Sequence, residues 1–263
     1  MNGMIHDCLL EMVDRKAIWM FVVVTIIAAL IIVATSSFSA QFEIEGQPDV
    51  DPLGGVIDVA ATKGLASHLG FMMFLAVFAT AGIIPNMLVR GRAEYYLSKP
   101  ISRTTFYLGR LVSIWLVYGA TIVVCGLVTL LLLYLSHGYS NANVVYLFVE
   151  CLFSYFIWLS ITTCAGIVFG STALAMMTAF LTYVLQIILS FHEVFHDFVG
   201  DKAIAKVGDF LYYIFPKTGE IGEIGESLAM GETVGSWMPV WSSLLFALAL
   251  IWTTVLVFNR KDY

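Results

Sequence analysis

Two histidines and a glutamate in the C-terminal half of the chain have the spacing of a zinc enzyme. His192, Glu193 and His196 form the pattern H-E-x-x-H, which on a helix places both imidazoles on one face to bind zinc and leaves the carboxylate as a general base. A zinc protease also needs a third ligand and a water-filled groove, and histidines that only solvate a helix end are commoner. We therefore expect no catalytic residue and no bound metal. A metal site on His192 and His196 stays an alternative, because four histidines are expected at one membrane boundary, namely His68, His137, His192 and His196.

Two polar residues stand inside otherwise apolar runs, Glu150 and Gln186. An ionisable residue within a membrane span is by default a functional hypothesis, so both are candidates for a translocation path. Glu150 lies near the start of its run, where its carboxylate could also extend outward to water.

The composition is that of a membrane protein. Of the 263 residues, 60% are apolar and 12% are charged, whereas a soluble domain is about 45–50% apolar and about 25% charged. The net charge of −6 argues against a nucleic-acid partner, which needs a clustered basic surface. Four cysteines, three of them inside apolar runs, give no disulfide framework. No G-x-x-x-x-G-K-[ST] motif occurs, so the chain has no visible nucleotide site of its own.

Six apolar runs are long enough to cross the hydrocarbon core as helices, which takes about 20 residues. The almost continuous run from 144 to 191 would make a helix of about 72 Å, so it must fold back, and Gly170–Ser171 is the best break. Gly166 and Gly170 also predict either a close helix approach or that turn, and Pro85 predicts a kink. We expect a single all-α transmembrane domain, 1–263, with spans at about 17–38, 69–89, 111–135, 144–169, 172–191 and 240–258.

Basic residues predict the orientation of these spans. Nine of the thirteen Lys and Arg residues fall in the N-terminal segment, in the loop between spans two and three, or in the C-terminal tail. Because short cytoplasmic loops carry the excess of Lys and Arg, we expect both termini and this loop in the cytoplasm, with the chain in the plasma or inner membrane. The nine residues are Arg15, Lys16, Arg90, Arg92, Lys99, Arg103, Arg110, Arg260 and Lys261.

Three segments outside the spans also have helical patterns. In residues 1–16, apolar side chains at helical spacing lie opposite acids such as Glu11, which predicts an interfacial amphipathic helix on the inner leaflet. Residues 204–215 predict an amphipathic or re-entrant outer helix before the last span. The G-E-I repeat from Gly219 predicts a turn that leads into a short helix at about 223–230.

The loop 90–110 is the one sizeable loop expected on the cytoplasmic side. Pro100, suited to the first position of a helix, with Ser102 and Arg103 after it, predicts a short helix from about Lys99. On composition alone, the loop is a basic anchor at the membrane surface.

The sequence from Gly91 to Arg103, GRAEYYLSKPISR, and the F-x-x-G-R that follows resemble a known pattern. That pattern is G-T-L-E-x-L-L-S-[KR]-P-[VI]-S-R-x-x-[FY]-x-x-G-[KR], from ABC transporter permeases of the second type, an exporter group with six spans per subunit. The segment Leu211–Pro216 and the terminal F-N-R-K-D are similar to two further motifs of that family. Arg92 and Ala93 depart from the Thr and Leu of the pattern.

The resemblance implies that the inner loop is a coupling helix that enters a groove on a separate ATP-binding subunit, with the N-terminal helix beside it. Two permease copies, identical or homologous, would form the translocation path as a dimer, and two ATPase subunits, with ATP and Mg²⁺, would power it. The chain itself would then be no enzyme and hold no cofactor, and its partners would be the ATPase, the second permease and membrane lipid. The implied coupling residues are Gly91, Glu94, Lys99, Pro100, Ile101, Ser102, Arg103 and Phe106.

Two other classes of function stay open at this point. A membrane scaffold or metalloenzyme-maturation factor would use an outer loop to bind a partner or a metal. A membrane zinc protease would use Glu193 as its base.

Overall fold

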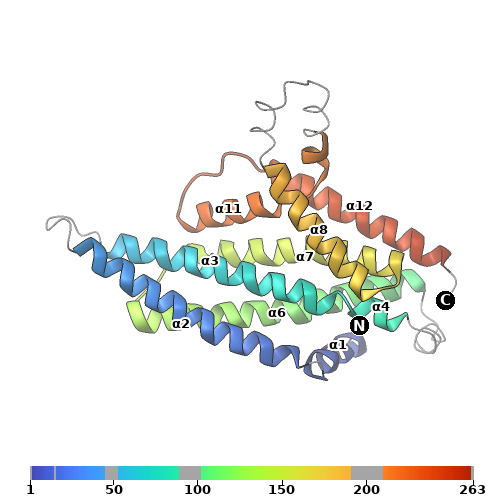
Figure 1. The fold of residues 1–263 in the computed structure, drawn as a ribbon, viewed down its shortest axis with the longest axis horizontal. Coiled ribbons are helices and arrows are strands. Elements are labelled where there is room, and N and C mark those ends of the chain that lie inside the picture. The colour runs from blue at the N-terminus through green and yellow to red at the C-terminus, as the bar shows by residue number, and fades with distance from the viewer. Residues whose placement is uncertain (1, 15, 45–52, 89–101, 191–209, 262–263) are drawn as a thin grey trace.

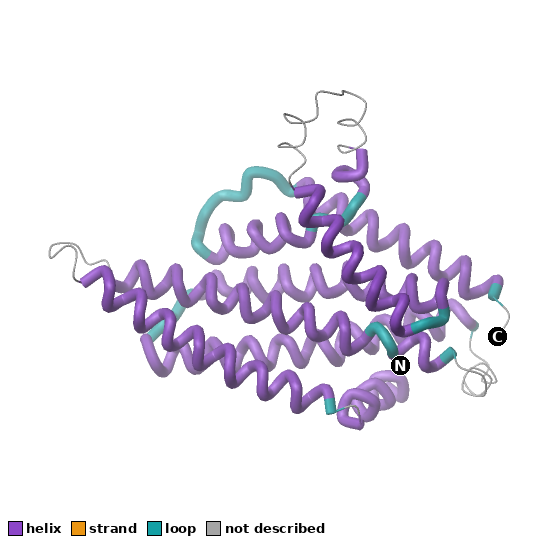
Figure 2. Tube along the Cα trace, in the orientation of Figure 1, coloured by secondary structure: helices purple, strands orange, loops and turns teal. Residues whose placement is uncertain are grey.

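The structure is a computed structural model that describes residues 2–14, 16–44, 53–88, 102–190 and 210–261. Within these ranges the chain forms helices and no strands, because each backbone group in lipid must be bonded within its own segment. Figure 1 and Figure 2 show the helices as one elongated bundle. In chain order the elements are α1 (Asn2–Asp14), α2 (Ala17–Ile44), α3 (Leu53–Thr80), α4 (Ile83–Met87), α6 (Arg103–His137), η1 (Ala142–Val144), α7 (Val145–Phe169), α8 (Thr172–Ser190), α11 (Thr218–Ala229) and α12 (Met238–Arg260).

The described residues contain six helical segments that are long and apolar enough to cross a membrane, which confirms the predicted number of spans. Two of them begin earlier than predicted: the second at Ile57 rather than near 69, and the third at Arg103 rather than near 111. A helix continues into the polar boundary because each added residue closes a backbone hydrogen bond, whereas the prediction followed apolar residues alone. The six segments are Ala17–Ser36, Ile57–Met87, Arg103–His137, Ala142–Phe169, Thr172–Ser190 and Met238–Arg260.

The helix α7 is the centre of the bundle. It contacts α3, α6, α8, α11 and α12, and nearly every side chain from Ser154 to Ile167 is buried. A helix that is apolar on all faces is typically buried on all faces. Figure 1 shows α11 and α12 along one side of the bundle, where both pack against α7.

The connection from α7 to α8 is a tight turn at the predicted break. Gly170 adopts a left-handed conformation with φ of 62°, and its N–H bonds to the carbonyl of Gly166 at 3.0 Å, which is how glycine ends many helices. Gly166 also allows a close approach, because a Cβ there would lie 3.0 Å from Cγ of Pro85. Since Pro85 has no N–H to donate to the carbonyl of Ala81, the chain turns at Ala81–Gly82 between α3 and α4.

The G-E-I repeat is helical from Thr218 onward, so the predicted turn at its start is wrong. The helix α11 runs antiparallel to α7, since Gly225 faces Glu150 while the carbonyl of Ala229 bonds to Asn141, just before α7, at 2.8 Å. A Cβ on Gly225 would lie 2.9 Å from Cβ of Glu150. Glycines that favour a turn in isolation thus let this helix pack directly against α7.

The N-terminal helix α1 forms within the predicted segment, and one side of it packs against α6. Cys8 and Met12 are buried on this side. Glu11, predicted to face away from the apolar side, instead bonds to Arg110 of α6. The predicted orientation of Glu11 is therefore wrong, because a buried guanidinium requires a counter-charge on the packed side.

Candidate functional site

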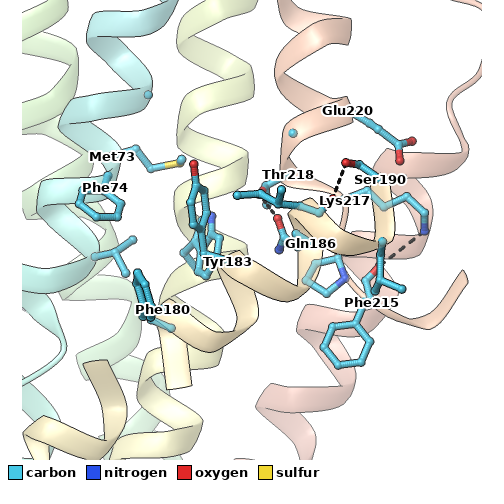
Figure 3. Close-up of a pocket in the computed structure, with 18 of the residues that line it drawn as sticks. Met73, Phe74, Phe180, Tyr183, Gln186, Ser190, Phe215, Lys217, Thr218 and Glu220 are labelled. Atoms are coloured by element: carbon cyan, nitrogen blue, oxygen red, sulfur yellow. Dashed lines mark hydrogen bonds between the residues drawn. The ribbon is translucent and has the colours of Figure 1, made fainter. Parts of the chain in front are cut away.

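A cavity of about 600 Å³ lies between α3, α8 and the segment that leads into α11. Aromatic side chains form much of its wall, and Figure 3 labels Phe74, Phe180, Tyr183 and Phe215 among them. Phe71 and Phe180 are 49% and 58% exposed on two candidate membrane spans, so part of the cavity wall lies at the surface of the bundle. A pocket of this size and lining is typical of a site for a drug-sized ligand. The aromatic lining includes Phe71, Phe74, Phe78, Trp158, Phe180 and Tyr183.

Gln186, one of the two predicted path residues, lines this cavity. Its side-chain oxygen accepts a hydrogen bond of 2.6 Å from the hydroxyl of Thr218, which joins α8 to the start of α11. Its side-chain nitrogen is buried and has no hydrogen-bond partner among the described residues. The amide is therefore held at one end and unsatisfied at the other.

Glu150, the other predicted path residue, is not part of the cavity lining. Its carboxylate accepts a hydrogen bond of 3.1 Å from the hydroxyl of Ser154, one turn further along α7, and Gly225 of α11 packs against its side chain. The structure thus separates the two residues that the sequence suggested for one path: Glu150 lies between two helices, and Gln186 faces a cavity.

Lys217 precedes α11 and joins it to α12. Its backbone N–H donates to the hydroxyl of Ser243 at 2.8 Å, and its ammonium donates to the hydroxyl of Ser242 at 3.3 Å. The ammonium also lies 4.4 Å from the ring centre of Tyr212. The residue is only 5% exposed, and this burial lowers the pKa of Lys217 from its ordinary value, against a smaller opposite effect of the Glu220 carboxylate.

The aromatic segment before Lys217 is the described part of the predicted outer helix. Residues 204–209 lie outside the described residues, and residues 210–214 are helical. Pro216 cannot continue that helix, and the chain turns there into α11. Lys217 was not among the predicted site residues, although a single lysine directly after a proline in an aromatic stretch was the signal that could have found it.

The structure describes only the last part of the predicted coupling region. The hydroxyl of Ser102 accepts a hydrogen bond of 3.1 Å from the N–H of Thr105 and so caps α6. Ser102 and Arg103 therefore begin a helix of 35 residues, and their predicted place inside a separate short helix is wrong. Five predicted coupling residues lie outside the described ranges, namely Gly91, Glu94, Lys99, Pro100 and Ile101.

Arg103 joins the start of α6 to the C-terminal tail. Its guanidinium donates to the carbonyl of Lys261 at 2.7 Å, and the ammonium of Lys261 donates to the carbonyl of Ile167 at 2.9 Å. Phe106, one turn further on, is buried and stacks on Phe258 with ring centres 6.4 Å apart. Phe106 thus packs in the chain's own core, and its predicted role in coupling stays a prediction.

Arg110 attaches α1 in the same region. Its guanidinium donates to the carboxylate of Glu11 at 2.7 Å and to the carbonyl of Met4 at 3.3 Å. We refer to Glu11, Arg103, Arg110 and Lys261 together as the terminal junction, because they hold the start of α6 against α1, α7 and the end of α12.

No metal cluster is found in the part of the chain that the structure describes, where no three His, Cys, Asp or Glu side chains are placed to hold an ion. His192 and His196 lie outside that part. His68 is 3% exposed and lies inside the bundle, in an α3 that begins at Leu53, and its predicted place at the membrane boundary stays a prediction.

Comparisons of the chain with protein-family models, with curated proteins and with solved structures found no match.

Proposed function

We propose that this chain is the membrane subunit of an ATP-driven exporter of the ABC type. Two copies, or one copy and a homologue, form the translocation path, and the loop that precedes α6 couples it to a separate ATPase in the cytoplasm. The similarity of the segment Gly91–Arg103 to the family pattern first suggests this function, and six helices suited to span a membrane are consistent with it.

The terminal junction is the observation that carries the proposal. The chain passes from the proposed coupling loop directly into α6, which continues without interruption for 35 residues, or about 52 Å. Arg103 ties this helix to Lys261, and Arg110 ties it to Glu11. A force applied to the loop by a partner would therefore move α6 together with α1 and the end of α12, as a rigid-body transition requires.

The cavity supports a transport role. It is lined by α3, by α8 and by the residues that lead into α11, and Lys217 links that segment to α12. A movement of α12 would therefore reach the cavity wall. An aromatic cavity with part of its wall exposed on two candidate spans suits cargo that is taken from the membrane.

The test is purification from the native membrane in mild detergent, followed by mass spectrometry of associated subunits. We expect an ABC ATPase in stoichiometric amount. Arg103→Glu should lose it, because the change breaks the bond to Lys261 and places a negative charge beside a partner groove expected to be acidic. Pro100→Gly should retain part of it but uncouple ATP hydrolysis from transport. Lys63→Glu, an equal charge reversal at an exposed residue on α3, is the control and should bind normally.

A different partner set would overturn the proposal. A scaffold or maturation factor would copurify with its client protein and without an ATPase. The amount of bound client would not change in Arg103→Glu. A protease would lose activity on Glu193→Gln while its association with other subunits stayed the same.

A further inference from the structure

The charges around the cavity bear on what it can hold. Lys217 and Glu220 are the charged residues that line it in the described part of the chain. The ammonium of Lys217 bonds to Ser242, and the carboxylate of Glu220 accepts a bond of 2.7 Å from the hydroxyl of Tyr212. Figure 3 shows both charged groups at one end, away from Phe74. An ionised ligand would lose its hydration in the aromatic part without gaining a counter-charge there.

Gln186 is the lining residue with a buried, unpartnered polar side-chain atom in the described part of the chain. Thr218 occupies the side-chain oxygen, so the nitrogen is the group that still needs a partner. Figure 3 shows this amide between Tyr183 and Thr218. The nitrogen is enclosed in this structure, and a rotation about the terminal torsion, which is broad in glutamine, would turn it toward the cavity while the oxygen moves relative to Thr218. An oxygen acceptor on a ligand would complete its hydrogen bonding, which lipid tails cannot do.

We propose that the cavity binds an uncharged, drug-sized amphiphile that enters from the bilayer between α3 and α8 and accepts a hydrogen bond from Gln186. Its apolar body packs against Phe74, Phe180 and Tyr183, which offer ring faces and edges for stacking. Its acceptor is a carbonyl or ether oxygen. This inference rests on the proposed function, since it assigns a substrate class to the cavity of the exporter.

The test measures binding to the purified chain in lipid nanodiscs, without ATP or an ATPase. Two neutral fluorescent probes are compared: Nile red, which carries a carbonyl acceptor, and pyrene, which has none. Energy transfer from tryptophan distinguishes bound probe from probe dissolved in lipid, because transfer is efficient only at short distance. Trp158 lines the cavity, so a Trp158→Phe variant gives the signal of the other tryptophans.

We expect saturable transfer to Nile red that falls in Trp158→Phe. Gln186→Leu should weaken Nile red binding about tenfold, the effect of one lost hydrogen bond to a buried donor, and leave pyrene unchanged. Phe180→Ala should weaken both probes. Phe169→Ala, at a phenylalanine of similar exposure that does not line the cavity, is the control and should change neither. Gln186→Met replaces Gln186→Leu if that variant does not elute as a folded protein.

Three results would overturn the inference. Equal Nile red affinity in wild type and Gln186→Leu would remove the role of Gln186, and transfer that is unchanged in Trp158→Phe would place the probes elsewhere. Tighter binding of the anionic dye anilinonaphthalene sulfonate than of Nile red would contradict the uncharged class. None of these results alters whether an ATPase copurifies, so the two proposals fail separately.

Discussion

The guanidinium of Arg110 donates to the carboxylate of Glu11 at 2.7 Å, across 99 residues of sequence. The two side chains are 3% and 20% exposed, so the pair is largely withdrawn from water. It holds α1, which precedes the first span, against the first two turns of α6, which follows the proposed coupling loop. Two segments that the sequence predicts to be cytoplasmic are thereby joined.

Glu11→Gln is expected to lower the free energy of unfolding by about 1–3 kcal/mol, because it leaves the charge of Arg110 buried without a counter-charge. Asp7→Asn, at an exposed position of the same helix, removes the same charge and should change stability by less than about 0.5 kcal/mol. Thermal unfolding in detergent measures both variants. Equal effects would mean that the ion pair contributes nothing to the attachment of α1.

Gly225→Ala should destabilise the protein by about 1–3 kcal/mol, the usual cost of overpacking. The new Cβ would lie 2.9 Å from both Cβ and Cγ of Glu150. Gly219→Ala is the matched control, because a Cβ there meets nothing within 4 Å and an alanine in an exposed helical position stabilises by about 0.5–1 kcal/mol. If both substitutions stabilise the protein, α11 does not pack against α7 as described.

Lys217 gives the stability a pH dependence of definite sign. Burial lowers its pKa in the folded chain, whereas the unfolded chain keeps the ordinary value of 10.5. Between these two pKa values the unfolded chain binds more protons than the folded chain, so the free energy of unfolding rises with pH. Below the pKa of the folded chain the buried ammonium is charged, and its full destabilising effect is present. Relative to Lys217→Met, wild type should therefore gain stability as the pH approaches 10.5. A stability difference that stays constant from neutral pH to that value would contradict this.

Arg103→Ala should release the C-terminal tail, because it removes a bond of 2.7 Å to the carbonyl of Lys261. Hydrogen exchange should become faster at the backbone N–H of Lys261, which bonds to the carbonyl of Val257 at 3.1 Å. The expected loss of local stability is about 1 kcal/mol, or roughly a fivefold faster exchange. Arg260→Ala removes an exposed arginine next to the tail residue and serves as the control. The same exchange rate in both variants would show that Arg103 does not hold the tail.

The spans were predictable from sequence because apolar length is a local property. Lipid forces any such run into a helix, and the turn at Gly170 followed from the excess length of the run from 144 to 191. The start of α11 was not predictable in this way. Glycines at 219 and 222 disfavour a helix in isolation, and the contact of Gly225 with Glu150 that outweighs this preference involves residues 75 positions apart.

The candidate site was predictable only in part. Gln186 stood out as a polar residue in an apolar run, and it does line the cavity. Glu150 stood out for the same reason, but it lies between α7 and α11. The polarity of a residue does not predict which face of its helix meets a cavity. The partners of Arg103 and Arg110 are 158 and 99 residues away, and no local pattern predicts a bond over such separations.

The most direct test of the central claim uses a cysteine at position 99, in the proposed coupling loop. Three native cysteines, Cys8, Cys125 and Cys151, are buried. Cys164 is partly exposed, so it is replaced by serine to lower the background labelling. We predict that Lys99→Cys is protected from a membrane-impermeant maleimide in intact cells, reacts once the membrane is opened, and crosslinks to a subunit that mass spectrometry identifies as an ABC ATPase. Labelling of position 99 in intact cells, with no ATPase in the crosslinked product, would contradict the account.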